Sequence, residues 1–134
     1  MLSRYLLIMA VSSPLSCLAD SPEALQAALA RDAKAADAGF AGFSVTRGAV
    51  FFKARHGSNW SCASCHTDNP LRPGRHAVTG KTITPLAPAA NPERFTDARN
   101  VDKWFRRNCS DVLGRVCTAA EKGDVLAYLL SLGN

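Results

Sequence analysis

The sequence predicts a single all-α domain. Three observations support this prediction: short segments with apolar residues at helical spacing, helix-start signals before several of them, and no alternating run typical of a strand. The length of 134 residues fits one domain, and an apolar fraction of 47% excludes a disordered chain. Aromatic residues make up only 7%, so something besides side chains is expected to fill part of the core.

The first expected helix follows a signal near the start of the chain. Ser21 is a suitable N-cap and Pro22 occupies the first helical position, where its missing N–H costs nothing. The helix is expected to continue to about Asp37. Its apolar side is thin, with Leu25 and Leu29 continued by alanines. We therefore expect a helix that packs on the core rather than one that forms it.

A second helix is expected from Thr46 to about Arg55, and Gly57 and Asn59 end it. Its buried side is expected to hold Val45, Ala49 and Phe52. Residues 69–92 are expected to form a loop, because proline interrupts them repeatedly, at Pro70, Pro73, Pro85, Pro88 and Pro92.

Two further helices are expected in the last third of the chain. Thr96 and Asp97 are expected to start one that ends near Asn108 and buries Val101, Trp104 and Phe105. Thr118 and Glu121 form a capping box that starts the last helix. This helix is expected to bury Val125, Leu126, Leu129 and Leu130.

Residues 1–19 have the features of a cleavable secretory signal peptide. One positive charge, at Arg4, precedes a short apolar stretch, and the small residue Ala19 suits the cleavage site. The apolar stretch is too short to span a bilayer. Cleavage would leave residues 20–134 as a periplasmic domain without membrane insertion. A lipid anchor at Cys17 is the alternative, although the residues before it fit a lipidation site poorly.

The strongest motif is C-x-x-C-H, formed by Cys62, Cys65 and His66. Two thiols at this spacing add to the two vinyl groups of a haem, and the adjacent histidine then lies under the iron. We therefore predict one covalent haem c with His66 as its proximal iron ligand. A thioredoxin-like dithiol would need a βαβ pattern, which is absent. A zinc site would need a second ligand pair, which His56 and His76 do not form.

Two cysteines remain, Cys109 and Cys117, eight positions apart. A disulfide is their natural use in an exported protein, and the loop-entropy model assigns it roughly 2–3 kcal/mol. Two free buried thiols are the alternative. The pair lies next to Asn108, so a redox-switch role is also open.

The sixth iron ligand determines the function. The only methionines, Met1 and Met9, lie in the signal segment, so the mature chain cannot supply the usual methionine. His56, His76, a lysine, a weak ligand such as an asparagine, or no ligand at all are the remaining possibilities. A bis-histidine site would be closed and would only transfer electrons. A weak or missing ligand would let the iron bind small molecules, and the residues alone leave both open.

Several uncommon residues follow the haem motif in an order that resembles the sphaeroides haem protein (SHP) family. With the motif itself, the similarity covers most of residues 60–132. The matching segments are residues 79–88, 92–97, 101–104, 107–109 and 114–122.

The resemblance implies a small class I cytochrome c fold around one covalently bound haem. It further implies that an asparagine is the sixth ligand of the ferric haem and leaves on reduction, after which the iron binds oxygen or nitric oxide. The matching residue here is Asn108. The family's disulfide corresponds to Cys109 and Cys117.

The charge pattern bears on partners. The net charge of +5 is small and scattered, which argues against nucleic acid. One helical face carries four basic residues: Arg99, Lys103, Arg106 and Arg107. This face is either simply solvated or a docking surface for an acidic redox partner. The resemblance implies such a donor, a dihaem cytochrome c supplied by a membrane cytochrome b.

Three functions follow from these observations. The first is a periplasmic cytochrome that accepts electrons and binds oxygen or nitric oxide when reduced. The second is a plain bis-histidine electron carrier. The third is an enzyme that turns over oxygen, nitric oxide or a peroxide, which would need an acid–base group over the iron. The sequence places no such catalytic group, so the question of enzyme activity is open.

Overall fold

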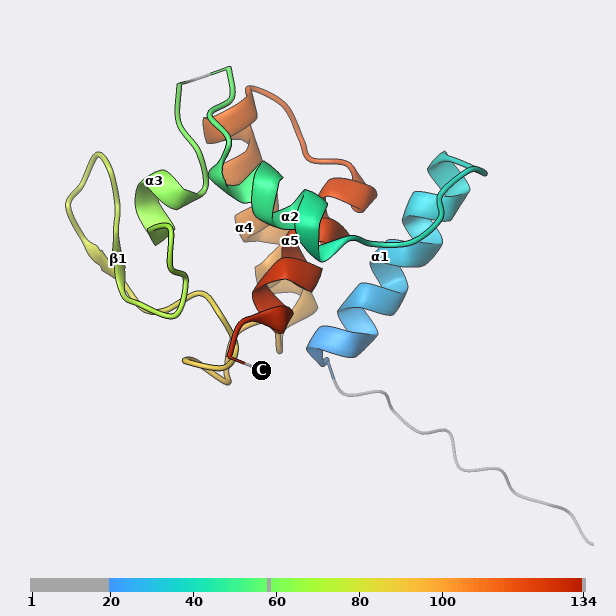
Figure 1. Ribbon diagram of the computed structural model, residues 1–134, viewed down its shortest axis with the longest axis horizontal. Coiled ribbons are helices and arrows are strands. Elements are labelled where there is room, and N and C mark those ends of the chain that lie inside the picture. The colour runs from blue at the N-terminus through green and yellow to red at the C-terminus, as the bar shows by residue number, and fades with distance from the viewer. Residues whose placement is uncertain (1–19, 58, 134) are drawn as a thin grey trace, which may run out of the picture.

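The computed structural model describes residues 20–57 and 59–133, so the expected signal peptide at residues 1–19 lies outside the described residues. Figure 1 shows a bundle with α1 at one end and β1 at the other. In the described part, the order of elements is α1 (Pro22–Ala36), α2 (Val45–Lys53), α3 (Ala63–His66), β1 (Gly74–Arg75), β2 (Thr82–Ile83), α4 (Ala98–Leu113) and α5 (Ala119–Ser131). No helix among these is long and apolar enough to cross a membrane.

Helix α1 begins where the cap residues predict. The Ala24 N–H donates to the Ser21 side chain at 3.1 Å, and Pro22 occupies the first turn. Leu29 and Ala33 are its buried residues, and α1 packs against α5. The helix ends at Ala36, one residue before the predicted end.

The closest helix packing is between α2 and α5. A Cβ added to Gly48 would lie 1.9 Å from the backbone oxygen of Asp124, so only glycine allows this approach. Phe52 is fully buried in α2, and its ring centroid lies 5.6 Å from that of Tyr128 in α5. The Arg47 Nε donates to the Asp124 carboxylate at 2.7 Å and joins the same two helices. These contacts fix α2 across α5.

The predicted buried side of α2 was partly wrong. Phe52 is buried and Ala49 packs against the core, but Val45 is 45% exposed. Val45 is the first residue after the N-cap Ser44, and the buried side of the helix passes through Gly48 instead. The last helix agrees with the prediction. Val125, Leu126 and Leu129 are core residues with Leu130 packed against them, and Tyr128 is a further core residue that was not predicted.

Helix α4 is longer than predicted. It begins after the N-cap Asp97 as expected, but it continues past Asn108 to Leu113. The buried residues Cys109 and Val112 extend the apolar spacing for another turn, and the helix ends at Gly114, whose φ of 70° is left-handed. Asn108 therefore lies inside the helix.

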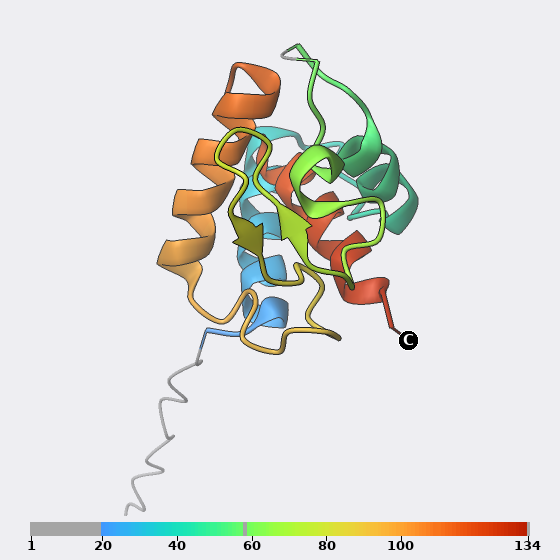
Figure 2. The same cartoon turned by 90° about the vertical axis from the view of Figure 1, so that its left-hand side faces the viewer.

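The proline-rich segment forms a loop with one small hairpin, where no strand was predicted. Gly74 pairs with Ile83 and Arg75 with Thr82. Strands of two residues are too short to show an alternating pattern. Figure 2 shows this hairpin on the same side of the molecule as α3.

We predict that Gly48→Ala destabilises the protein by about 1–3 kcal/mol, because its Cβ would overlap the backbone of α5. Urea unfolding measures this free energy. Gly57→Ala is the matched control: its Cβ would have Leu113 O at 3.7 Å as its nearest neighbour, so a change of about 0.5 kcal/mol or less is expected. Equal stabilities of the two variants would contradict the packing described here.

Candidate functional site

The C-x-x-C-H residues lie at the short helix α3 and the residue before it. Cys62 and Cys65 are both free thiols and both half-buried. Ser61 and Ser64 brace the start of the turn, since the Ser61 N–H donates to Ser64 Oγ at 3.0 Å and the Ser64 N–H donates to Ser61 Oγ at 3.1 Å. Burial raises the pKa of the Cys62 thiol to about 11, so it is protonated at neutral pH.

His66 ends α3 with its ring near the core. Its ring centroid lies 6.4 Å from that of Phe52. Burial, followed by the positive charge of Arg94, lowers the pKa of His66 to about 4. The imidazole is therefore neutral at physiological pH, which is the form that binds a metal.

The hairpin lies directly against α3. A Cβ at Gly74 would lie 2.1 Å from the backbone oxygen of Cys65, so the strand is in backbone contact with the motif. The Ala77 N–H also donates to Cys65 Sγ at 3.3 Å. The hairpin thus covers one side of the motif and limits how α3 can move.

Asn108 has an unusual place in α4. It is four residues before the buried Val112 and seven after Val101, which packs against the core, so it shares their side of the helix. Asn108 is nevertheless exposed. Trp104, one turn earlier, was predicted to be buried but is 45% exposed. Helical spacing cannot distinguish an indole in the protein core from one on a surface that another group covers.

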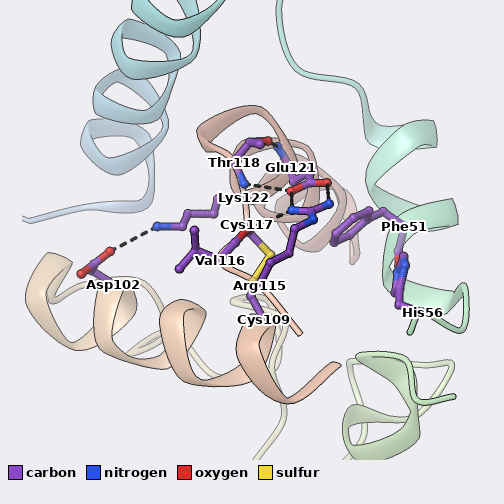
Figure 3. The surroundings of a disulfide bond; sticks show 10 residues. All are labelled: Phe51, His56, Asp102, Cys109, Arg115, Val116, Cys117, Thr118, Glu121 and Lys122. Atoms are coloured by element: carbon purple, nitrogen blue, oxygen red, sulfur yellow. Dashed lines mark hydrogen bonds and ion pairs between the residues drawn. A yellow bond between two sulfur atoms is a disulfide. The ribbon is translucent and has the colours of Figure 1, made fainter. Parts of the chain in front are cut away.

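A disulfide ties the residue after Asn108 to the segment before α5. Cys109 and Cys117 are bonded, with their Cα atoms 5.6 Å apart. Figure 3 shows this bond between the end of α4 and the start of α5.

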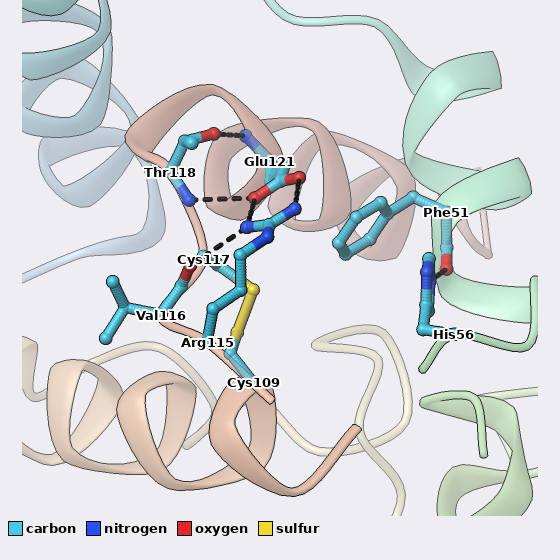
Figure 4. A network of polar contacts seen from close by, with 8 residues as sticks. All are labelled: Phe51, His56, Cys109, Arg115, Val116, Cys117, Thr118 and Glu121. Atoms are coloured by element: carbon cyan, nitrogen blue, oxygen red, sulfur yellow. Dashed lines mark hydrogen bonds and ion pairs between the residues drawn. A yellow bond between two sulfur atoms is a disulfide. The ribbon is translucent and has the colours of Figure 1, made fainter. Parts of the chain in front are cut away.

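The loop closed by the disulfide is held by a second set of contacts. Arg115 donates to both carboxylate oxygens of Glu121, at 2.8 and 2.6 Å, and to the Val116 carbonyl at 2.9 Å. Glu121 also accepts from the Thr118 N–H and completes the predicted capping box, as Figure 4 shows. The hydrogen bond from Arg115 lowers the pKa of Glu121. The loop is therefore constrained at several points.

The two other histidines are engaged by their own segments. The His56 Nε2 lies 3.1 Å from the Phe51 carbonyl, and its ring lies 4.8 Å from the Phe51 ring. His76 Nδ1 accepts from the Val78 and Thr79 N–H groups, both at 3.2 Å. The contact of His56 uses Nε2, whereas those of His76 use Nδ1 and leave its Nε2 available to a metal.

These residues fit a covalent haem. Two free thiols at the attachment spacing are followed by a neutral imidazole. The exposed amide of Asn108 adds an oxygen atom that can coordinate a metal. Cys62 and Cys65 could hold the porphyrin, and His66 and Asn108 could bind its iron. Among the described residues no cluster of three or more histidine, cysteine or acidic side chains could hold a separate metal ion.

A family model of a domain of unknown function, DUF1924, matches residues 38–129. The chain belongs to this family. It is 47% identical over 92 residues to cytochrome c'' of Methylophilus methylotrophus and 54% identical over 69 residues to the c-type protein SHP of Cereibacter sphaeroides. These matches cover 66% and 52% of this chain and span 64% and 53% of the two relatives.

Solved structures agree with these relatives. Oxidised cytochrome c'' of M. methylotrophus superposes with a TM-score of 0.74 at 41% identity, covering 82% of this chain and 93% of that one. Oxidised SHP, described as an oxygen-binding cytochrome c, has a TM-score of 0.72 at 40% identity, covering 82% and 96%. The predicted fold is confirmed: this is an all-α, SHP-like class I cytochrome c fold. The chain is a c-type cytochrome of this family, and its relatives imply a covalently bound haem c.

Sequence reasoning missed two residues next to the motif. Gly74 permits the backbone contact with Cys65, and Arg94 places its charge near His66. The sequence Pro73–Gly74 indicates a turn, but it does not reveal that this turn contacts Cys65. Arg94 lies in a segment that matches the SHP family, but its distance along the chain from the C-x-x-C-H motif indicates no role at the site.

We predict that a double variant, Cys109→Ser with Cys117→Ser, loses roughly 2–3 kcal/mol of stability, the value for a loop closed over eight positions. Urea unfolding with and without dithiothreitol measures it. The wild-type midpoint should fall with the reductant, whereas that of the variant should not respond. A wild-type midpoint indifferent to reduction would show that the bond contributes little.

Proposed function

We propose that this chain is a periplasmic monohaem cytochrome whose iron alternates between a closed and an open sixth position. In this proposal Cys62 and Cys65 attach the haem and His66 is the proximal ligand. The Asn108 side chain binds the ferric iron and leaves on reduction. The reduced protein then binds oxygen or nitric oxide.

The position of Asn108 is the single observation that carries the proposal. Asn108 is exposed one turn after the exposed Trp104, on the side of α4 where Val101 and Val112 pack inward, and it directly precedes the disulfide-bonded Cys109. The Asn108 side chain makes no hydrogen bond to another residue among residues 20–57 and 59–133, so its amide is free to bind another group.

An amide oxygen is suited to a ligand that binds the ferric iron and dissociates on reduction. Haem, when bound, supplies an iron that changes charge by one on reduction. The neutral, hard oxygen of Asn108 binds ferric iron better than ferrous iron, so the arrival of an electron weakens this bond. The rigid end of α4 keeps the side chain close, so that it can return on oxidation.

Two relatives support this proposal by what is reported of them. The SHP structure is that of an oxygen-binding cytochrome c. A solution structure of M. methylotrophus cytochrome c'', with a TM-score of 0.74 and 40% identity, is described in terms of haem-ligand detachment. A sixth position that opens would account for both descriptions, and Asn108 would provide it here.

We predict that Asn108→Ala changes the absorption spectrum of the ferric protein but not that of the ferrous protein. Ferric affinity for added imidazole should rise about tenfold or more, because the amide no longer competes for the iron. Spectral titration under argon measures both effects. Asn100→Ala, an exposed asparagine near the start of α4, should behave like the wild type.

Two results would contradict this assignment. An unchanged ferric spectrum in Asn108→Ala would exclude the amide as a ligand. A wild-type ferrous spectrum that is low-spin and does not respond to carbon monoxide, oxygen or nitric oxide would exclude gas binding. In that case a histidine would have to close the site.

We further propose that α4 docks an acidic redox partner, and the resemblance suggests a dihaem cytochrome c. Arg106 forms an ion pair with Asp102 at 2.5 Å, so its charge is partly neutralised within the helix. The Lys103 Nζ and the Arg107 Cζ each lie 5.8 Å from the ring centroid of Trp104. Neither residue has an acidic partner among the described residues. Tryptophan and arginine are enriched among the residues that contribute most to binding at protein interfaces.

We predict that Lys103→Gln with Arg107→Gln slows reduction by the anionic reagent ferrous EDTA several-fold at low salt, because the attractive charge is lost. The difference should vanish at high ionic strength. Arg31→Gln with Lys34→Gln removes the same charge from exposed positions on α1 and is the matched control. Equal rates for the two double variants would place electron entry elsewhere. Stopped-flow absorbance at several salt concentrations measures the rates.

A further inference from the structure

Helix α4 is tied at two points to α5 and the segment before it. The Lys122 Nζ donates to the Asp102 carboxylate at 3.2 Å, and Cys109 is bonded to Cys117. Figure 3 shows both ties between the same two stretches of chain. Asp102 and Cys109 lie seven positions apart on α4, and their partners lie five positions apart. The first tie is ionic and can open, whereas the second is covalent.

The two tied residues of α4 lie on one face of the helix. Seven residues of an α-helix fall about 20° short of two full turns and span roughly 10 Å along the axis. A helix that is tied at one point can still swing about that point. Two ties on one face, two turns apart, fix the side that the helix presents to its neighbours. Asn108 directly precedes Cys109, so the direction of its side chain depends on both ties.

The apolar contacts of α4 restrain its rotation less sharply than the ion pair does. Val101 and Phe105 pack against the core, but apolar contacts are non-directional and tolerate a small turn of the helix. The Lys122 ammonium instead acts at one carboxylate on α4. It is itself well held, because its side chain is only 18% exposed and its Nζ lies 6.0 Å from the Phe105 ring centroid. Lys122 is therefore a fixed point against which α4 is oriented.

Asp102 binds a second cation, which does not join the two helices. Arg106 lies four residues later on α4 itself and donates to the same carboxylate at 2.5 Å. Hydrogen bonds from Arg106 and then from Lys122 lower the pKa of Asp102, so this carboxyl is charged at neutral pH. Of these two cations, Lys122 alone reaches across from α5. Arg106 is therefore a matched comparison, with the same charge on the same partner.

We propose that Lys122 is a positioning residue that, through Asp102, holds α4 in the rotation at which the Asn108 amide can bind ferric iron. The inference rests on the proposed function, in which Asn108 is the ferric ligand. No electron moves in the step concerned, because the amide oxygen leaves the ferric iron and an added ligand takes its place. Loss of the ionic tie lets α4 turn, so the amide is bound for less of the time and the added ligand binds more tightly.

The test measures imidazole binding to the ferric holoprotein by spectral titration. Lys122→Met keeps the apolar stem and removes the ammonium. It should raise the imidazole affinity about two- to fivefold, the range that a partly exposed ion pair can supply. Arg106→Gln removes the same charge from the same carboxylate and should match the wild type. In the Asn108→Ala background, Lys122→Met should have no effect, because the amide that Lys122 positions is gone.

A second variant keeps the test valid if Lys122→Met does not fold. Asp102→Asn breaks the tie from its other end, at a side chain that is 51% exposed, and should also raise the imidazole affinity. It changes the net charge in the opposite direction to Lys122→Met. A rise in both variants therefore reports the lost tie, whereas a long-range effect of charge on the ferric site would move the two affinities in opposite directions.

Three outcomes would overturn the proposal. Equal affinities in Lys122→Met, Arg106→Gln and the wild type would leave Lys122 with a purely structural role. The same rise in Lys122→Met with and without Asn108 would show that Lys122 acts on the site by another route. Opposite changes in Lys122→Met and Asp102→Asn would assign the effect to charge alone. Failure of the proposed function would appear separately, because Asn108→Ala by itself would then leave the ferric spectrum and the imidazole affinity unchanged.

Discussion

The close approach of α2 and α5 is the constraint on which the rest of the molecule depends. It requires glycine at position 48, because any side chain there would overlap α5. The rings of Phe52 and Tyr128 pack together in the same interface. Because α3 contacts α2, the place of α2 helps to determine where the attachment motif lies. Because α5 follows the disulfide, the same contact also sets where the end of α4 is anchored. The two sides of the candidate haem site are therefore positioned by one helix pair.

The two sides differ in how they are held. On the side of His66, hydrogen bonds from the backbone hold the hairpin and the Pro70 loop against the motif. On the side of Asn108, a covalent bond and a two-point ion pair restrain a loop between two helices. A ligand that must leave and return needs a backbone that does not follow it. The stiffer support lies on the side where ligand exchange is proposed.

Local chemistry allowed much of this to be predicted from the sequence. Cap residues start their helices within a few residues of themselves, so Ser21, Asp97 and Thr118 located three helix starts. The C-x-x-C-H spacing is equally local. The end of α4 was misplaced at Asn108, because the apolar spacing continues through Cys109 and Val112 and the left-handed Gly114 ends the helix only after Leu113. Trp104, the hairpin and Arg94 depend on contacts between distant segments, which spacing along the chain does not reveal.

The oxidation states of the four cysteines in residues 20–134 have a consequence for biosynthesis. Thioether formation requires Cys62 and Cys65 as reduced thiols, whereas Cys109 and Cys117 are oxidised. One compartment must therefore oxidise one pair and spare the other. A cell that lacks either a thiol oxidant or a thiol reductant would therefore mature this cytochrome poorly.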